Sequence, residues 1–279
     1  MVFLILCSLV LEDTLIMTSA QRHTSADTQA VFRQVLNIVA LGTVLTVNAL
    51  ANIVPINGIT TGELSDSFNS LVTPAGYVFS IWGLIYLLLV GFVIYQALPS
   101  QKHNPVLEKI GYLFALSCLF NSAWIFAWHY KVFWLSEVFM LGILFSLIAI
   151  YLRIDGSREH LSRTEQFTVR LPFSVYLGWI TAATILNTTV VLLNAGVTGG
   201  SAAPIWGVIM VGAALLIASL VLFRKDDVAY AAVLIWAFIG IAVAEWTITP
   251  AVVIAALIAA AVLAGFSLYQ AIRSKRVAV

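Results

Sequence analysis

The feature that most constrains this chain is a series of eight apolar stretches, each about as long as a bilayer is thick. A helix crosses the hydrocarbon core with roughly 20 mainly apolar residues, because its backbone polar groups must be satisfied within the segment. Of the 279 residues, 61% are hydrophobic and only 10% are charged, whereas a soluble domain carries about 25% charged residues. The sequence therefore predicts an all-α, polytopic membrane helical bundle of about eight transmembrane helices, at residues 34–54, 75–97, 110–130, 133–152, 171–193, 204–223, 228–247 and 250–272.

Proline and charge patterns agree with this division. A proline at or just before the start of a helix loses no helical hydrogen bond, and four of the stretches begin in this way, at Pro74, Pro172, Pro204 and Pro250. Short cytoplasmic loops carry the excess of Lys and Arg. With the amino terminus inside, 13 of the 14 Lys and Arg residues fall on inner segments and Lys131 alone falls outside. We therefore expect both termini to be cytoplasmic.

The amino terminus is treated separately as a tail at residues 1–33. Phe3 to Leu11 is an apolar run of the length found in a signal-peptide core, but no basic residue precedes it and two acidic residues follow at once. We expect translation to start at Met17, so residues 1–16 are expected to be absent from the mature chain. The rest is divided into a five-helix domain at 34–194 and three additional transmembrane helices at 195–279.

Several functional classes are disfavoured. A formal net charge of +1 lacks the basic excess that nucleic-acid binding requires. Cys7 and Cys118 can build neither a disulfide framework nor a four-ligand metal site. The chain has no phosphate-binding Gly-rich loop, His-Glu-x-x-His or Gly-x-Ser-x-Gly motif. The four histidines lie in tails or near loops, so an intramembrane metal-ligating or haem-ligating pair is not expected: His23, His103, His129 and His160.

Only two carboxylates lie within the predicted spans. Glu137 and Glu245 are each about one turn from the outer end, whereas proton-coupled transporters place Asp, Glu or His at membrane depth. The favoured interpretation is that both side chains snorkel to the interface. The alternative is a role in admitting a ligand or an ion.

Amide and indole side chains at membrane depth are the unusual feature of the first five spans. Asn121, Trp124 and Trp128 follow one another at spacings of three and four, so they lie on one helix face. A second set, Trp179, Ala183 and Asn187, has strict four-residue spacing, and the span at 75–97 adds Tyr77, Phe79, Trp82 and Tyr86. Three such faces could enclose a flat apolar ligand by stacking, with the amides orienting its polar edge.

A purely structural interpretation stands beside this one. Aromatic residues near span ends commonly form an interfacial belt, which accounts better for Trp134, Trp246, Tyr130 and Trp206. Asparagine in membrane helices often hydrogen-bonds a neighbouring helix, at about 0.6 to 2 kcal/mol per contact. The spacing alone leaves the interhelical and the ligand-binding interpretations equal.

Three motifs resemble the translocator protein / tryptophan-rich sensory protein (TspO/MBR) family. Thr73-Pro-Ala-Gly-Tyr-Val-Phe-Ser-Ile-Trp-Gly-Leu-Ile-Tyr86 is similar to the second-helix signature of that family. Asn121-Ser-Ala-Trp124 with Phe126 resembles its third-helix Asn-x-x-Trp motif. Leu171-Pro-Phe with Trp179-Ile-Thr-Ala-Ala-Thr-Ile-Leu-Asn187 resembles its fifth-helix motif. The resemblance covers roughly residues 34–194.

The resemblance implies a five-helix bundle in a bacterial cytoplasmic membrane. Its pocket would bind tetrapyrroles, sterols or synthetic aromatic ligands, and a porphyrin or haem-like tetrapyrrole is the possible ligand. Short members of the family often pair, so a homodimer is possible. Carried over by position, the ligand-binding candidates are Trp82, Tyr86, Asn121, Trp124, Phe126, Trp179, Ala183 and Asn187.

The sequence also departs from the family pattern. After Asn187 it lacks the Tyr and Arg of the proposed sterol-recognition pattern, so cholesterol binding is not supported. Tyr77 replaces the usual Trp, and the loop at 55–72 is longer and more polar than the short aromatic-rich loop of the family. The three carboxy-terminal helices have no counterpart in short family members.

Three hypotheses follow. The leading one is a membrane receptor or transporter that binds a flat hydrophobic molecule between the spans at 75–97, 110–130 and 171–193, beneath the 55–72 loop. The second is a membrane enzyme that degrades or modifies a porphyrin or another lipophilic pigment, for which the sequence supplies no acid, base or metal. The third, a carrier of polar solutes, requires midplane charges that are nearly lacking.

Overall fold

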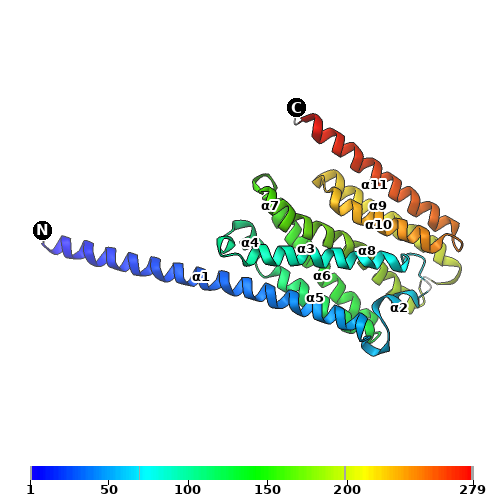
Figure 1. Cartoon of the computed structure of the whole chain (residues 1–279), viewed down its shortest axis with the longest axis horizontal. Helices are drawn as coiled ribbons and strands as arrows, with labels where there is room; N and C mark the ends of the chain where they lie inside the picture. The colour runs from blue at the N-terminus through cyan, green and yellow to red at the C-terminus, as the bar shows by residue number, and fades with distance from the viewer. Residues whose placement is uncertain (1, 69, 198, 278–279) are drawn as a thin grey trace.

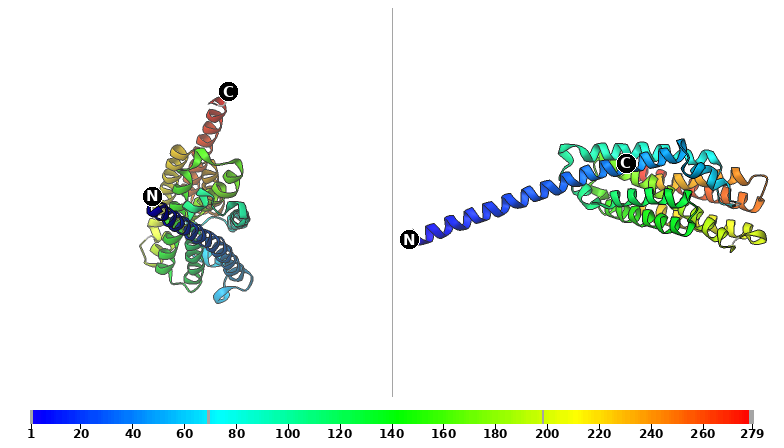
Figure 2. Two further views of the ribbon diagram at one scale, coloured as in Figure 1. Left: turned by 90° about the vertical axis from the view of Figure 1, so that its left-hand side faces the viewer. Right: turned by 90° about the horizontal axis from the view of Figure 1, so that it is seen from below.

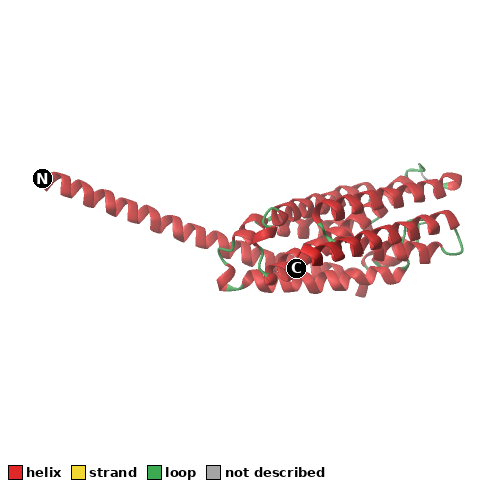
Figure 3. Cartoon of the chain, turned by 90° about the horizontal axis from the view of Figure 1, so that it is seen from above, coloured by secondary structure: helices red, strands yellow, loops and turns green. Residues whose placement is uncertain are grey.

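The computed structural model describes the backbone of residues 2–68, 70–197 and 199–277 and the side chains within 26–68, 70–197 and 199–273. The regular elements of the described chain are helices, without a strand (Figure 3). The long helices are α1 (Val2–Ile53), α3 (Ile81–Ala97), α5 (Leu113–His129), α6 (Phe133–Asp155), α8 (Leu171–Asn194), α9 (Ala203–Lys225), α10 (Val228–Glu245) and α11 (Pro250–Val277). The predicted helical bundle is confirmed. Most helix ends fall within a few residues of the predicted ones, but α1 begins at Val2 rather than near residue 34.

Seven helical stretches in the described chain are long and apolar enough to cross a membrane: Ala26–Ile53, Gly76–Ala97, Phe133–Asp155, Arg163–Asn194, Gly200–Lys225, Val228–Glu245 and Pro250–Arg273. Each spans the roughly 30 Å of hydrocarbon at 1.5 Å per residue or comes close to it. The remaining predicted span, at 110–130, corresponds to α5, which is apolar but has only 17 residues. Its length is at the lower end of the range for a spanning helix, about 17–25 residues.

Short helices form most of the connections. The loop after α1 contains η1 (Ile56–Gly58) and α2 (Thr61–Asp66), which the sequence pattern did not predict. η2 (Gly76–Ser80) leads into α3 and forms the start of the predicted span at 75–97. Between α3 and α5 lie η3 (Pro99–Gln101) and α4 (Pro105–Ile110). Between α6 and α8 lie η4 (Arg158–His160), α7 (Arg163–Glu165) and the π-helical turn η5 (Gln166–Arg170), and η6 (Gly200–Ala202) precedes α9.

α1 is much longer than the other helices. Its amino-terminal part runs beyond the bundle as a single rod (Figure 2), so the polar residues 18–29 continue the helix of the first span. The expected start at Met17 and the thiol of Cys7 concern residues whose side chains lie outside the described part. Both termini leave the bundle on the side of α4 and α7, and α2 lies at the opposite end (Figure 1).

The helices pack in a chain of neighbours. α5 packs against α1 and α6, α6 against α8, and α8 against α10, which in turn contacts α9 and α11. Between α3, α5 and α8 three rings form an edge-to-face cluster, with centroids 5.1 Å apart for Phe92 and Phe114 and 4.9 Å apart for Phe92 and Phe173. All three phenylalanines are fully buried, so this cluster fixes the spacing of the three helices below the candidate site.

Basic residues of α1, α4 and α6 lie at the α4 end of the bundle. Arg33 donates to the Lys102 carbonyl at 2.9 Å, and Arg153 donates to the Lys109 carbonyl at 2.8 Å. Lys131 lies at the opposite end, in the turn between α5 and α6. This segregation agrees with the predicted alternation of loops, whereas the assignment of the α4 end to the cytoplasm remains a prediction.

α10 supports the segment that leads into α3. The Gly240 carbonyl accepts a hydrogen bond from the Ala75 amide at 3.1 Å, and the Trp236 indole donates to the Val78 carbonyl at 3.1 Å. Tyr77 packs edge-to-face on Trp236 with centroids 5.2 Å apart. The carboxy-terminal helices therefore hold η2 in place, and η2 carries the first aromatic residues of the candidate site.

Candidate functional site

A cavity of about 710 Å³ lies toward the α2 end of the bundle, between α1, α2, α3 and α5. It is called the large cavity below. It is lined by Leu45, Asn48, Ala49, Asn52, Ile53, Thr60, Thr61, Gly62, Gly76, Phe79, Trp82, Tyr86 and Trp124. Its volume falls within the range of small-molecule sites, about 300–1,000 Å³.

A second, much smaller cavity lies behind it and is called the inner chamber. Its volume is about 30 Å³, which is room for one water or a small polar group. It is lined by Thr61, Ser65, Phe79, Trp82, Trp124, Trp128, Met140, Trp179, Ala183, Leu186 and Asn187. Thr61, Phe79, Trp82 and Trp124 line both spaces, so the large cavity and the inner chamber are neighbours that share a wall.

The position of these spaces differs from the prediction. The sequence placed the pocket between the spans that became α3, α5 and α8, but the larger volume is bounded by α1 rather than α8. α8 contributes only to the inner chamber, through Trp179, Ala183 and Asn187. α8 packs against α6 and α10. The polar contact between α1 and α3 lies at the α4 end of the bundle, where Gln34 donates to the Gln96 carbonyl at 2.7 Å. The space between these two helices is therefore left at the α2 end.

The aromatic side chains form two stacks around the cavities. Trp82 stacks on Tyr86 with centroids 5.3 Å apart, and Trp124 stacks on Trp128 with centroids 5.8 Å apart. Trp179 meets Trp82 edge-to-face at 6.2 Å. Offset-stacked and edge-to-face pairs are the favoured arrangements of aromatic rings, so the walls are ordered by their own contacts.

Asn187 is held by a carboxylate. Its Nδ2 donates to Glu137 Oε2 at 2.6 Å, and the Thr188 hydroxyl donates to Glu137 Oε1 at 2.7 Å. Asn187 Oδ1 in turn accepts the Trp124 indole N–H at 3.1 Å and the Ser136 hydroxyl at 3.3 Å. Glu137 therefore fixes the orientation of the Asn187 amide and, through this amide, that of the Trp124 ring. The Glu137 carboxylate thus bonds to α8 instead of snorkelling to the interface.

Asn121 occupies the interhelical role that the sequence left open. It is fully buried, its Oδ1 accepts from Asn48 Nδ2 at 2.8 Å, and its Nδ2 donates to the Tyr176 hydroxyl at 3.2 Å. These bonds join α5 to α1 and α8. Asn121 lines neither the large cavity nor the inner chamber, although its partner Asn48 lines the large cavity.

Three buried polar atoms at the inner chamber have no hydrogen-bond partner among the described residues. They are Trp128 Nε1, Trp179 Nε1 and Ser65 Oγ, and each residue is at most 3% exposed. Buried polar groups are nearly always paired, since an unpaired one costs about 1–3 kcal/mol. Two N–H groups and one hydroxyl of chamber-lining residues are thus without a partner among the described residues.

The loop over the site is anchored by a histidine. His129 ends α5 fully buried, and its Nδ1 donates to the Ile56 carbonyl at 3.0 Å. With Nδ1 as the donor, Nε2 of a neutral imidazole is a hydrogen-bond acceptor, and the Thr61 hydroxyl donates to it at 2.9 Å. Asn57 also donates to the His129 carbonyl at 3.0 Å. The α2 segment is therefore tied to α5 directly beside the cavities.

α2 has its own start signal. Thr60 and Glu63 form a capping box, in which each side chain bonds the other residue's backbone N–H. The hydrogen bonds from the Thr60 amide and hydroxyl hold the pKa of the Glu63 carboxyl below its usual value. The loop at 55–72 thus carries a short capped helix that places Thr61 and Ser65 over the inner chamber.

The predicted site residues separate into three groups. Trp82, Tyr86 and Trp124 line the large cavity, while Trp179, Ala183 and Asn187 line the inner chamber. Asn121 supports the wall from behind. Phe126 is 46% exposed and lines neither space, because it lies two residues beyond Trp124 and so on a different face of α5.

Sequence reasoning missed several residues at the site. Trp128 was noted in the aromatic pattern but not chosen, although its four-residue distance from Trp124 carried the signal. Asn48 and Asn52 on α1 repeat the same spacing in a helix that was read only as a span. His129 and Thr61 gave no such signal, since their contact depends on how the loop folds back.

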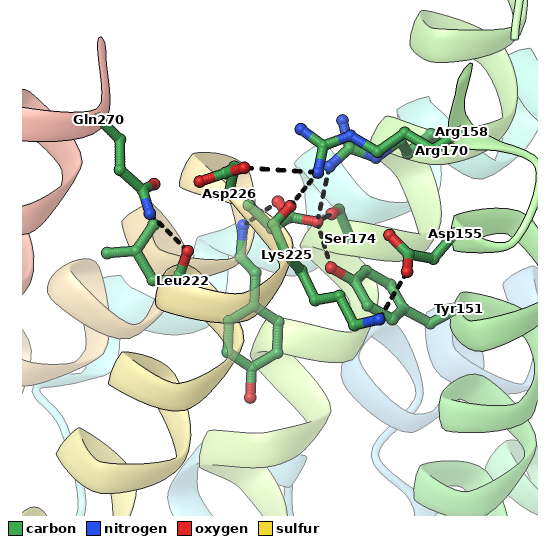
Figure 4. A network of polar contacts seen from close by, with 11 residues as sticks. Tyr151, Asp155, Arg158, Arg170, Ser174, Leu222, Lys225, Asp226 and Gln270 are labelled. Atoms are coloured by element: carbon green, nitrogen blue, oxygen red, sulfur yellow. Dashed lines mark hydrogen bonds and ion pairs between the residues drawn. The ribbon is translucent and has the colours of Figure 1, made fainter. Parts of the chain in front are cut away.

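A separate polar network ties the carboxy-terminal helices to the bundle at the α4 end (Figure 4). Asp227 is only 3% exposed and caps α10 by accepting the Tyr230 amide at 3.1 Å. It also accepts the hydroxyls of Tyr151, at 2.8 Å, and of Ser174, and lies 3.6 Å from an Arg170 nitrogen. Side chains from α6, η5 and α8 thus converge on the turn between α9 and α10.

These features define the class of the protein: a polytopic helical membrane protein with an aromatic cavity covered by a loop. A family model described as TSPO-like protein matches residues 34–269, which is most of the chain. The chain therefore belongs to the TSPO-like family. The match continues through the three carboxy-terminal helices, beyond residue 194 where the motif resemblance ended. No curated protein and no solved structure gives a significant match.

Proposed function

We propose that this protein binds a flat hydrophobic ligand of the tetrapyrrole class in the large cavity, as the step common to transport and sensing. The observation that carries the proposal is the combination of a cavity of about 710 Å³ with two stacked aromatic pairs on its walls. An apolar ring system gains affinity from burial of its faces against such rings.

The inner chamber supplies the polar end of this recognition. Trp128 and Trp179 offer N–H groups with no partner among the described residues, so they suit a ligand that carries a hydrogen-bond acceptor such as a carboxylate or a carbonyl oxygen. A chamber of about 30 Å³ accommodates only that acceptor group and not the rings. The ligand would therefore lie with its flat body in the large cavity and one acceptor directed at the two indoles.

The ligand would enter the large cavity beside α1. Ala49 and Ile53 line the large cavity from α1 and are exposed, Ile53 at 78%. A hydrophobic ligand dissolved in the bilayer would reach the cavity between α1 and α3 without crossing water. The loop that carries Thr61 would close the end of the cavity nearest the membrane surface.

The test is quenching of tryptophan fluorescence by protoporphyrin in the purified full chain, with three variants and two controls. Ala49→Trp fills the cavity from an exposed position, and Trp82→Leu removes one stacking ring. A base stacked on an aromatic ring loses about 1–3 kcal/mol when that ring is removed, so Trp82→Leu should weaken binding at least fivefold. The matched controls are Ala261→Trp on α11 and Trp134→Leu, whose ring is 66% exposed.

A double variant, Trp179→Phe with Trp128→Phe, tests the polar end. It keeps two rings and removes both N–H donors, so it should weaken binding of protoporphyrin more than binding of its dimethyl ester, which has weaker acceptors. Unchanged protoporphyrin affinity in both Ala49→Trp and Trp82→Leu would reject the cavity as the site. Flux of a bound porphyrin through proteoliposomes then separates transport from sensing.

A further inference from the structure

A further cavity shares no lining residue with the candidate site. This cavity, of about 350 Å³, opens between α6, α8 and α9 near the α4 end, and is called the lateral groove. α6 and α9 have little direct contact with each other. Their side chains form the two walls of the groove, and side chains of α8 and α10 form its floor. The lining residues that carry the argument are Ile148, Leu152, Ile217, Leu220, Arg224 and Lys225.

The walls of the lateral groove suit a hydrocarbon chain. Leu152, Ile217 and Leu220 are 54%, 41% and 48% exposed, and they lie on helices long and apolar enough to cross the membrane. The polar groups of the floor are occupied, because the Tyr230 hydroxyl donates to Thr181 at 2.8 Å and Tyr151 donates to Asp227. The groove therefore offers apolar contact along its length and no free hydrogen-bonding group in its floor.

The mouth of the groove carries positive charge. Arg224 and Lys225 form the last turn of α9, at the end of the membrane span. Lys225 is neutralised by Asp155, with Nζ and Oδ2 2.6 Å apart (Figure 4). Arg224 is exposed and has no ion pair with any carboxylate in the described residues. No acidic residue is among the groove's described lining, so the Arg224 guanidinium lies at the end of the span without an ion-pair partner among the described residues.

We propose that the lateral groove binds an anionic phospholipid, with one acyl chain between α6 and α9 and the phosphate on Arg224. An arginine pairs with phosphate by two parallel hydrogen bonds. Basic pockets between transmembrane helices are a known type of acidic-lipid site, worth about 1 kcal/mol per basic residue near the surface. A zwitterionic lipid would share the acyl contacts but would bring its own positive group to the same guanidinium.

A bound lipid would act together with the neighbouring Asp227 network, which attaches the carboxy-terminal helices to the bundle. The groove is bounded by α9, which connects to the bundle at this end through Asp227 and the turn before α10. An acyl chain between α6 and α9 would fill the space that the two helices leave open. Binding should therefore stabilise the attachment of the carboxy-terminal helices to the rest of the protein.

The experiment is native mass spectrometry of the full chain released from nanodiscs that contain equal amounts of palmitoyl-oleoyl phosphatidylglycerol and phosphatidylcholine. The wild type should retain one phosphatidylglycerol preferentially. Arg224→Gln should lower this adduct about fivefold, the factor that corresponds to about 1 kcal/mol, without changing the phosphatidylcholine adduct. The matched control is Arg163→Gln, which removes an exposed arginine of the same end away from the groove.

A second pair of variants tests the acyl chain. Ile217→Trp fills the groove and should abolish the retained lipid, whereas Ile254→Trp alters an exposed isoleucine of α11, outside the groove, and should leave it unchanged. Equal phosphatidylglycerol retention in Arg224→Gln and Arg163→Gln would overturn the proposal. So would retention in Ile217→Trp, or displacement of the lipid by millimolar glycerol phosphate, which would indicate a site for the free anion.

Discussion

Replacing Gly240 by alanine is expected to loosen the support that α10 gives to η2. A methyl group at this position would overlap the Val78 side chain and lie 3.0 Å from Pro74 Cβ. Val78 is fully buried, so it has no free direction in which to move. The close approach that lets the Gly240 carbonyl accept from Ala75 therefore depends on the missing side chain.

The expected size follows from two opposing effects. Overpacking a well-packed core costs about 1–3 kcal/mol, and alanine in place of glycine inside a helix returns about 0.5–1 kcal/mol. The net loss is about 1 kcal/mol, which corresponds to a fall in Tm of about 2–4 °C for a chain of this size. Because η2 carries Phe79 and leads into Trp82, protoporphyrin binding should weaken in the same variant.

The assay is thermal unfolding in detergent, followed by tryptophan fluorescence, together with the protoporphyrin titration. Gly212→Ala is the control, because a methyl group at this α9 position meets no atom within 4 Å and should leave the protein equally or more stable. If Gly240→Ala unfolds at the same temperature as Gly212→Ala and binds the ligand normally, the close contact between α10 and η2 is refuted.

Two further predictions concern buried polar contacts. A double-mutant cycle with Asn48→Ala and Asn121→Ala should give a coupling energy of about 0.6–1.7 kcal/mol in thermal or denaturant unfolding; a coupling near zero would show that the 2.8 Å bond between the two amides contributes nothing. Asp227→Asn should lower stability by about 1.5–3 kcal/mol, the usual worth of hydrogen bonds to a charged group, while Asp226→Asn, 60% exposed, should have little effect. Equal stability in the two aspartate variants would exclude Asp227 as the anchor of α10.

The helices were largely predictable because hydropathy and proline act locally. α11 begins at Pro250, since proline is favoured in the first turn of a helix. Pro172 instead lies within the continuous helical stretch Arg163–Asn194, just after the π-helical turn η5. α2 escaped prediction because it is six residues long and carries no apolar period, only the capping box that starts it.

The site was predictable only in part, because spacing fixes a helix face but not the helix that it meets. The regular positions of Trp124 and Trp128 correctly placed both rings on one face of α5. The same reasoning could not tell that Asn121, on that face too, would bond Asn48 of α1 instead of lining a cavity. It also could not assign Glu137, since its partnership with Asn187 depends on the rotation of α6 against α8.

The covering of η2 by α10 limits how copies of this protein can associate. Trp236 and Gly240 contact Tyr77 and Val78, so a second subunit has no access to the part of η2 that these two residues cover. Large apolar side chains stay exposed on other helices, for example Leu87 on α3, Leu119 on α5 and Leu216 on α9, and a symmetric pair would have to use such surfaces. Chemical crosslinking between cysteines introduced on those helices would map such a pair without disturbing the aromatic walls.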